Sequence, residues 1–185
     1  MDFNNYHGFS LIELIMMIAI IAILAVPGAY ILMYLLKNSV FIPNKLNMDM
    51  LASDAFGSMI EGDSVAKGLR FSKSITAVAD NQITFNNQTG QSIIYRLDTV
   101  ANRLYRSING AAETLLPYYI ASGVTMTGKS NKLFTYYDAS EVVTAVPANV
   151  RWITMSLIAK TGTGLYQDWQ GQTDQTTSIA VKKFQ

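Results

Sequence analysis

The sequence predicts an α+β fold in which a long N-terminal helix packs against an antiparallel β-sheet meander. Three observations lead to this expectation. An apolar run fills residues 9–36, apolar residues recur at helical spacing over residues 46–60, and an alternation with a period of two begins at Leu69. The expected order is therefore one helical segment followed by hairpins.

The apolar run from Phe9 to Leu36 predicts the first part of the helix. Glu13 is its only charged residue, and the stretch from Leu14 to Leu36 carries no charge. A helix rises about 1.5 Å per residue, so about 20 residues cross a hydrocarbon core that is about 30 Å thick. We therefore expect a transmembrane helix within residues 9–40, in contact with the lipid bilayer.

Two other interpretations of this run fit less well. The core helix of a small soluble domain is normally amphipathic, whereas this run is apolar throughout. A secretory signal peptide has an apolar region of about 7 to 15 residues behind a basic segment, but residues 1–8 contain neither Lys nor Arg. Half of all residues are hydrophobic and 15% are charged, which is more apolar than a soluble domain of this length needs.

Glu13 is the anomaly of the apolar run. A carboxylate at the centre of a bilayer costs about 2.5 to 3.5 kcal/mol, and less near an interface. Glu13 is then either hydrated in the headgroup layer or neutralised by a cationic partner.

The segment GFSLIEL at residues 8–14 resembles the cleavage and N-methylation signal of type IV prepilins and type II secretion pseudopilins. The resemblance implies that a prepilin peptidase cuts after Gly8, removes residues 1–8 as a leader peptide and methylates Phe9. It also implies that Glu13 pairs with the N-terminal amine of a neighbouring subunit during filament assembly. The fold that it implies is the pilin fold.

The same resemblance implies a location and a set of partners. The chain would be a single-pass protein of the bacterial inner membrane, with its head outside the cytoplasm, and would then enter a pilus or pseudopilus filament. Its partners would be prepilin peptidase, other pilin or pseudopilin subunits and the inner-membrane assembly platform. The leader lacks the Lys or Arg that family leaders usually carry, so the orientation rests on the processing motif rather than on positive charge.

Two features are expected to break the helix. Pro27-Gly28 predicts a kink or a melted turn, and the resemblance implies that such residues allow partial unwinding when the helix leaves the bilayer. Phe41-Ile42-Pro43 predicts a second break, after which Asn44 would cap an amphipathic helix within residues 41–62 that ends near Gly62.

The remainder, residues 63–185, is expected to form a globular β-rich head. Turn residues such as Asp80-Asn81 and Asn109-Gly110 separate its candidate strands. The order of these segments resembles that of minor pilins and pseudopilins. The predicted strands cover residues 69–79, 82–86, 92–97, 103–108, 123–127, 132–137, 152–159 and 178–183.

The residue inventory argues against an enzyme. The chain has no cysteine, and its single histidine, His7, lies in the predicted leader. The usual nucleophile-base pairs and zinc sites are therefore absent from the mature sequence, and we expect no catalytic residue, cofactor or metal. Asp168 and Asp174 flank a polar stretch that is either a calcium site or a solvated loop, and their spacing fits no calcium-loop signature.

Other surface features carry weaker signals. A formal net charge of +1 gives no electrostatic case for nucleic acid. Asn87-Gln88-Thr89 satisfies the N-glycosylation sequon within a predicted hairpin turn. Six aromatic residues of the head form either a sugar-binding surface or core and cross-strand pairs. They are Tyr118, Tyr119, Tyr136, Tyr137, Trp152 and Trp169.

The sequence therefore predicts a structural subunit of a type IV pilus or a type II secretion pseudopilus. The alternative is a minor pilin that the same helix displays as an adhesion or DNA-binding module. A membrane-tethered enzyme is a third class, for which the sequence offers no catalytic constellation.

Overall fold

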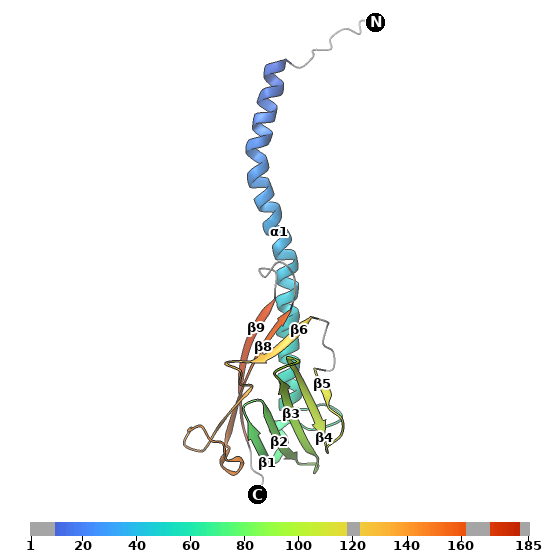
Figure 1. Cartoon of the computed structure of the whole chain (residues 1–185), viewed down its shortest axis with the longest axis vertical. Helices are drawn as coiled ribbons and strands as arrows, with labels where there is room; N and C mark the ends of the chain where they lie inside the picture. Colours follow the sequence, from blue (N-terminus) through green and yellow to red (C-terminus); the bar gives the residue numbers. More distant parts are fainter. Residues whose placement is uncertain (1–9, 118–122, 162–170, 182–185) are drawn as a thin grey trace. The chain divides into compact units, whose positions relative to one another are not determined.

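The computed structural model describes residues 10–117, 123–161 and 171–181. The chain divides into two compact units, Met1–Val40 and Phe41–Gln185. The elements are shown in Figure 1. Each unit is described by itself.

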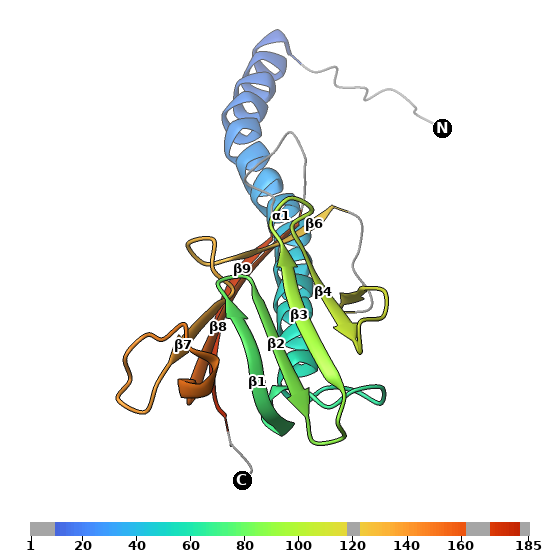
Figure 2. The same ribbon diagram turned by 60° about the horizontal axis from the view of Figure 1, so that its bottom comes forward.

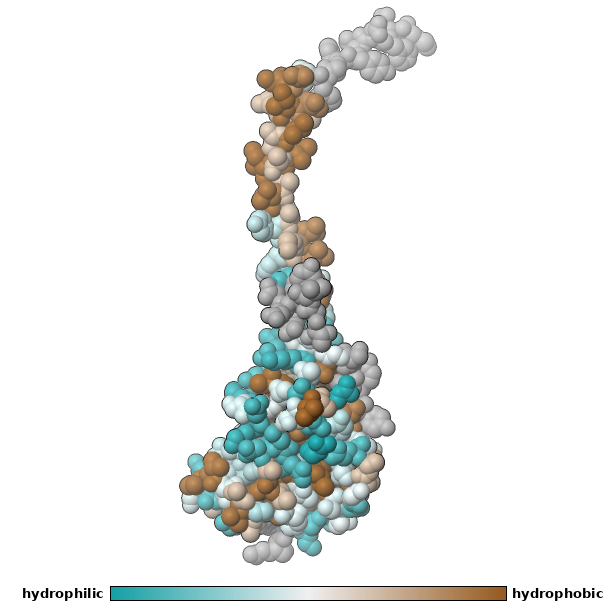
Figure 3. Space-filling view, viewed as in Figure 1, coloured by the Kyte–Doolittle hydropathy of each residue, from teal (hydrophilic) through white to brown (hydrophobic). Residues whose placement is uncertain are grey.

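The described part of the first unit is the beginning of helix α1 (Leu11–Ile60). Its large apolar side chains are exposed on every face, and those from Leu11 to Leu36 give the helix the brown surface in Figure 3. The helix is long and apolar enough to cross a membrane, and none of its most apolar stretch is buried within the chain. This agrees with the predicted long apolar N-terminal helix.

Helix α1 is helical through both Pro27-Gly28 and Pro43, so neither position is a melted turn or an end of the helix. A proline removes one backbone donor and disturbs one carbonyl four residues earlier, but the hydrogen bonds on either side continue the helix. Gly28 adds a cost of about 1 kcal/mol, which the surrounding Leu, Ile, Met and Ala offset. Asn44 consequently lies inside the helix and is not its cap.

The later part of α1 belongs to the second unit and buries one of its faces. Its buried residues are spaced three or four apart, which places them on one face of the helix. The helix ends at Ile60, beyond which the Glu61 N–H donates to the Gly57 carbonyl at 2.9 Å and Gly62 adopts a φ of 84°. The buried residues are Met48, Ala52, Ala55, Phe56 and Met59.

The first sheet is an antiparallel meander in the order β1-β2-β3-β4-β5 (Figure 2). The segment expected as one strand over residues 69–79 begins instead as a short 3₁₀ helix, η1 (Leu69–Phe71). The three-residue strand β5 was not predicted, because it is too short to show an alternation. The strands are β1 (Ser72–Ala79), β2 (Gln82–Asn87), β3 (Ser92–Asp98), β4 (Arg103–Ile108) and β5 (Thr114–Leu116).

The second sheet contains β6 (Val124–Gly128), β7 (Phe134–Tyr137), β8 (Trp152–Thr161) and β9 (Gln172–Ala180), with the 3₁₀ helix η2 (Pro147–Asn149) before β8. Strand β8 is central. It pairs with β9 along nearly its whole length, with β7 at residues 152–155 and with β6 at residues 157–161.

Strands β6 and β7 therefore share one edge of β8, end to end. The prediction of a single meander is wrong for this half of the head, because these pairings join residues far apart in the chain. Strand β9 also begins before the predicted Ser178. Its early residues are nearly all polar and show no apolar alternation.

The core of the second unit lies where α1 and the two sheets pack together. The rings of Phe85 and Tyr95 lie 5.7 Å apart, and those of Phe134 and Tyr136 lie 6.0 Å apart. The Tyr136 hydroxyl lies 3.0 Å from the Ala79 carbonyl oxygen, which links β7 to the turn between β1 and β2. Burial raises the pKa of the Tyr136 hydroxyl, which stays neutral in this contact.

Candidate processing and assembly site

Helix α1 begins with two reciprocal hydrogen bonds between Ser10 and Glu13. The Glu13 N–H donates to Ser10 Oγ at 3.2 Å, and the Ser10 N–H donates to Glu13 Oε2 at 2.9 Å. The Leu14 N–H donates to the Ser10 carbonyl at 3.2 Å. Ser10 is thus the N-cap of the helix, and Glu13 completes a capping box.

The capping box gives Glu13 a local structural role that the sequence interpretation missed. The signal was present, since Ser-x-x-Glu directly before an apolar run is typical of a helix start. An N-cap of this kind stabilises a helix by about 0.5 to 2 kcal/mol, and a carboxylate in the first turn also interacts favourably with the helix dipole. The carboxylate is therefore held at the very start of the apolar helix.

The helix that follows presents a surface suited to close helix packing. Ala25, Val26, Ala29, Tyr30 and Met33 line an apolar hollow of about 390 Å³. The hollow arises where the small alanine side chains lie between larger ones. Small residues of this kind let two helix backbones approach each other closely in membranes.

Several predicted site residues lie outside the described residues, so their roles stay predictions. For processing these are Gly8 and Phe9, with residues 1–8. In the head they are Tyr118, Tyr119, Asp168 and Trp169. Pro27 and Gly28 are described and lie within α1.

The candidate calcium pair is only half described. Asp174, on β9, forms an ion pair with Lys129 at 3.1 Å. Among the described residues, no group of three or more His, Cys, Asp or Glu side chains could hold a metal ion.

The predicted glycosylation sequon begins at the last residue of β2 and continues into the turn after it, and its asparagine is buried and hydrogen-bonded. Asn87 is fully buried, and its Nδ2 donates to Gln91 Oε1 at 2.9 Å. Its Oδ1 accepts the N–H groups of Thr89 and Gln91. The amide that would carry a glycan is thus enclosed, and the sequon serves the turn.

The aromatic residues of the head divide between core and surface. Tyr136 is buried, which agrees with the core interpretation. Tyr137 and Trp152 form a cross-strand pair between β7 and β8, and the Trp152 side chain is exposed.

Comparison with known protein families gives one match. The family model described as the prokaryotic N-terminal methylation motif matches residues 3–29. No curated protein and no solved structure matches the chain.

This motif, followed by a long apolar helix and antiparallel sheets, fits a type IV pilin or pseudopilin with a pilin-like α+β architecture. It supports a precursor that prepilin peptidase processes, a membrane anchor and assembly into a pilus-type filament. It also points to a structural subunit rather than an enzyme.

Proposed function

We propose that this chain is a structural subunit of a type IV pilus or a type II secretion pseudopilus. The observation that carries the proposal is the placement of Glu13 at the first turn of a helix whose apolar residues are exposed all around. The subunit is stored in the bacterial inner membrane with its head, residues 63–185, outside the cytoplasm. The inner-membrane assembly platform then moves it into the filament.

The exposed apolar surface of α1 favours both the insertion of the helix into the membrane and its later packing in the filament. Residues 9–40 are first covered by lipid and later by the same helices of neighbouring subunits. Residues 41–62 continue the helix and anchor it in the head through its buried face. Pro27-Gly28, where helix propensity is lowest, is the place at which α1 unwinds during this transfer.

Glu13 sets the register of assembly. Once the leader of residues 1–8 is removed, Phe9 carries a free amine at the same end of each subunit. An unpaired carboxylate in an apolar environment is penalised, so a neighbour whose amine reaches Glu13 is favoured over one that is shifted along the helix. The capping box with Ser10 keeps the carboxylate at the level where that amine arrives.

The first experiment tests processing. The chain is coexpressed with a prepilin peptidase, and its intact mass and N-terminal peptide are measured by mass spectrometry. We expect loss of residues 1–8 and one added methyl group on Phe9. Gly8→Val should block the cut, and the matched Gly28→Val should leave it unchanged. An intact Met1 terminus, or a cut elsewhere, contradicts the proposal.

The second experiment tests assembly. Glu13→Ala should leave membrane insertion and processing intact, and should lower incorporation into sheared filaments by about tenfold or more, as expected when a charge loses its buried partner. Asp54→Ala, which removes an exposed carboxylate from the later part of α1, is the control. Normal incorporation of the Glu13→Ala chain would remove the pairing from the mechanism.

A displayed minor pilin with an adhesive head is the second candidate, and it is favoured by the exposed Trp152, which helps to line a surface pocket with Tyr137 and Glu141. The near-neutral charge gives no support to its DNA-binding variant. Deletion of the gene separates the roles, since loss of filaments indicates a major structural subunit, whereas intact filaments that no longer adhere indicate a minor one.

A further inference from the structure

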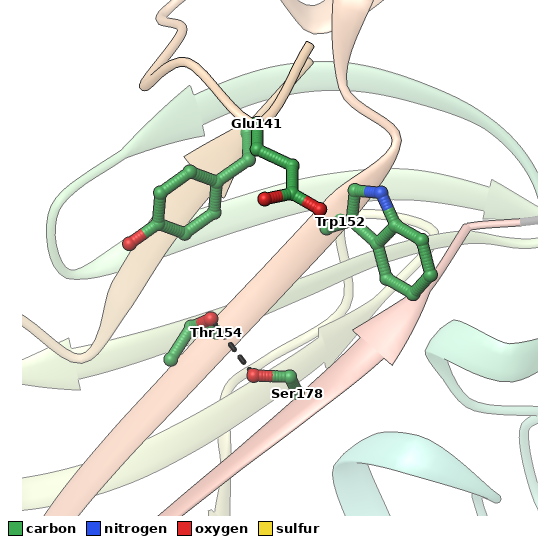
Figure 4. Close-up of a pocket in the computed structure, with 5 residues that line it drawn as sticks. Glu141, Trp152, Thr154 and Ser178 are labelled. Carbon is green, nitrogen blue, oxygen red and sulfur yellow. Dashed lines mark hydrogen bonds between the residues drawn. The ribbon is translucent and has the colours of Figure 1, made fainter. Parts of the chain in front are cut away.

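A small pocket opens on the outer face of the second sheet, far along the chain from the assembly site. Its volume is about 290 Å³. Five residues from β7, β8, β9 and the loop after β7 line it, and Figure 4 shows four of them labelled. The lining residues are Tyr137, Glu141, Trp152, Thr154 and Ser178.

Trp152 is the aromatic wall of this pocket. Its side chain is 45% exposed, whereas the next residue, Ile153, is fully buried. Strand β8 is paired on both sides at this point, with Tyr137 on β7 and Ala180 on β9. The indole is therefore held on a rigid strand, and the small Ala180 beside it does not cover it.

Glu141 brings a negative charge to the same pocket, and its carboxylate lies next to Trp152 in Figure 4. The residue has a φ of 61°, a conformation that costs a non-glycine residue about 1 kcal/mol or more. Asp138 fixes this turn, because its Oδ1 accepts the N–H groups of Ser140 and Val142. Within the described part of the chain, no ion pair involves Glu141.

Besides Trp152 and Glu141, the pocket has two hydroxyl groups that bond to each other and an apolar loop beside it. Thr154 Oγ1 and Ser178 Oγ are hydrogen-bonded to each other at 2.9 Å. Val142 and Val143, which follow Glu141 in the same loop, are 59% and 65% exposed. An incoming ligand thus meets two aromatic residues, one carboxylate that forms no ion pair with any described residue, and a nearby apolar loop.

We propose that this pocket binds an alkylammonium group, such as the trimethylammonium of a choline headgroup or of a methylated lysine. The faces of Trp and Tyr attract organic cations, and Glu141 adds a full opposite charge. Methyl groups on the cation match the apolar surroundings. A volume near the lower end of the range for ligand pockets suits a group of this size rather than a larger ligand.

Charge complementarity favours a cation over a neutral sugar. A sugar also stacks on an aromatic face, but it gains affinity from several hydrogen bonds, and two of the three hydroxyls that line the pocket, those of Thr154 and Ser178, already pair with each other. A cation also supplies an opposite charge to Glu141, which forms no ion pair with any described residue. This site does not depend on the proposed filament role, and failure of one leaves the other standing.

The test uses the full chain with Trp169→Phe, in a polyoxyethylene ether detergent that contains neither sugar nor choline. Trp152 is then the only tryptophan. Choline chloride is titrated against sodium chloride at constant ionic strength, and the Trp152 fluorescence is recorded. We expect a saturable change with choline and none with sodium.

Matched variants assign the response to the pocket. Glu141→Gln keeps the shape of the side chain and should weaken choline binding by about tenfold, while the exposed Asp54→Asn should leave it unchanged. Saturation-transfer NMR of the choline methyl protons gives a second readout that needs no tryptophan, and Trp152→Leu should abolish it. Circular dichroism spectra verify that each variant is folded.

The proposal is overturned by the absence of saturable choline binding, by an equal response to sodium, or by unchanged affinity in Glu141→Gln. It is also overturned if a neutral sugar binds equally well to the parent and to Glu141→Gln, which would assign the pocket to glycans. If choline binds, phosphatidylcholine vesicles and a trimethyllysine peptide distinguish a lipid source from a protein source, with phosphatidylglycerol vesicles and the unmethylated peptide as controls.

Discussion

The Asp63 carboxylate joins the end of α1 to the first sheet. It accepts a hydrogen bond from Arg106 Nη1 at 2.8 Å and from the N–H groups of Val65 and Ala66. Arg106 is buried, and its Nε has no partner within the described residues. Asp63 supplies the opposite charge that offsets the burial of this guanidinium, and the Tyr95 hydroxyl also interacts with it.

The pKa of Asp63 reflects this balance. Desolvation by burial raises it, but the N–H groups of Ala66 and Val65 and the Arg106 guanidinium together lower it below its usual value of 3.8. When the pKa of a carboxyl group is lower in the folded chain than in the unfolded chain, the group contributes its full stabilisation at pH values above the pKa of the unfolded chain. That stabilisation is lost as the pH falls through the pKa of the folded chain.

Replacing Asp63 by Asn should consequently destabilise the head by about 1 to 3 kcal/mol at pH 7, because Arg106 loses its charged partner. Water screens part of this interaction, because the Asp63 side chain is 38% exposed. Thermal unfolding followed by circular dichroism measures the change.

The pH dependence provides an independent readout of the same pair. The parent should lose stability as the pH falls below about 4, and Asp63→Asn should lose less over that range. Asp98 and Glu113, whose pKa values Arg96 helps to lower, contribute the acid sensitivity that remains in the variant. Identical acid profiles for parent and variant would contradict this account of Asp63.

At the scale of elements, the turn after α1 is a tight crossing of two backbone segments. Gly62 and Lys67 form a β-bridge, and the Gly68 N–H donates to the Glu61 carbonyl at 3.1 Å. A Cβ on Gly68 would lie 2.5 Å from the Ile60 carbonyl oxygen and 2.6 Å from the Gly62 nitrogen. The path of the chain from the end of α1 into η1 therefore requires a residue without a Cβ at position 68.

Gly68→Ala should therefore destabilise the head by about 1 to 3 kcal/mol, since rigid backbone atoms have to move. Gly57→Ala is the matched control, because it lies within α1 and a Cβ there meets nothing within 4 Å. It should stabilise the protein by about 0.5 to 1 kcal/mol. The midpoints of urea unfolding measure both changes in stability. A Gly68→Ala chain as stable as the parent would contradict the close backbone contact at Gly68.

At the scale of the whole molecule, the two units differ in how their apolar residues are covered. Every buried core residue of the described chain lies between Met48 and Val181, within the second unit. Among the residues that the structure describes, the large apolar side chains of the first unit are all exposed. The second unit thus has a buried core of its own, whereas the exposed apolar helix of the first unit fits a membrane anchor.

A chain that begins at Phe41 should accordingly remain soluble without detergent and retain its β-sheet signal. The full chain should require detergent or lipid under the same buffer conditions. Size-exclusion chromatography and far-UV circular dichroism measure the two properties. Aggregation or loss of the β-signal in the shortened chain would show that the core depends on residues 1–40.

The sequence by itself determined the parts of this protein that depend on local pattern. The apolar run identified the membrane helix, and the motif around Glu13 identified the family resemblance. Both are contiguous stretches of sequence, so recognising them requires no knowledge of tertiary contacts. The hairpins of the first sheet followed for the same reason, since neighbouring strands pair across turns such as Asp80-Asn81.

Only the tertiary structure decided the rest. The sharing of β8 by β6 and β7, the burial of Asn87 and the meeting of Glu141 with Trp152 all join residues whose contacts the local sequence does not encode. Helix α1 also passed through Pro27 and Pro43, where local propensity predicted breaks, because the flanking hydrogen bonds outweigh the one that each proline removes. Local pattern determines which elements form, and long-range packing determines which side chains they bring together.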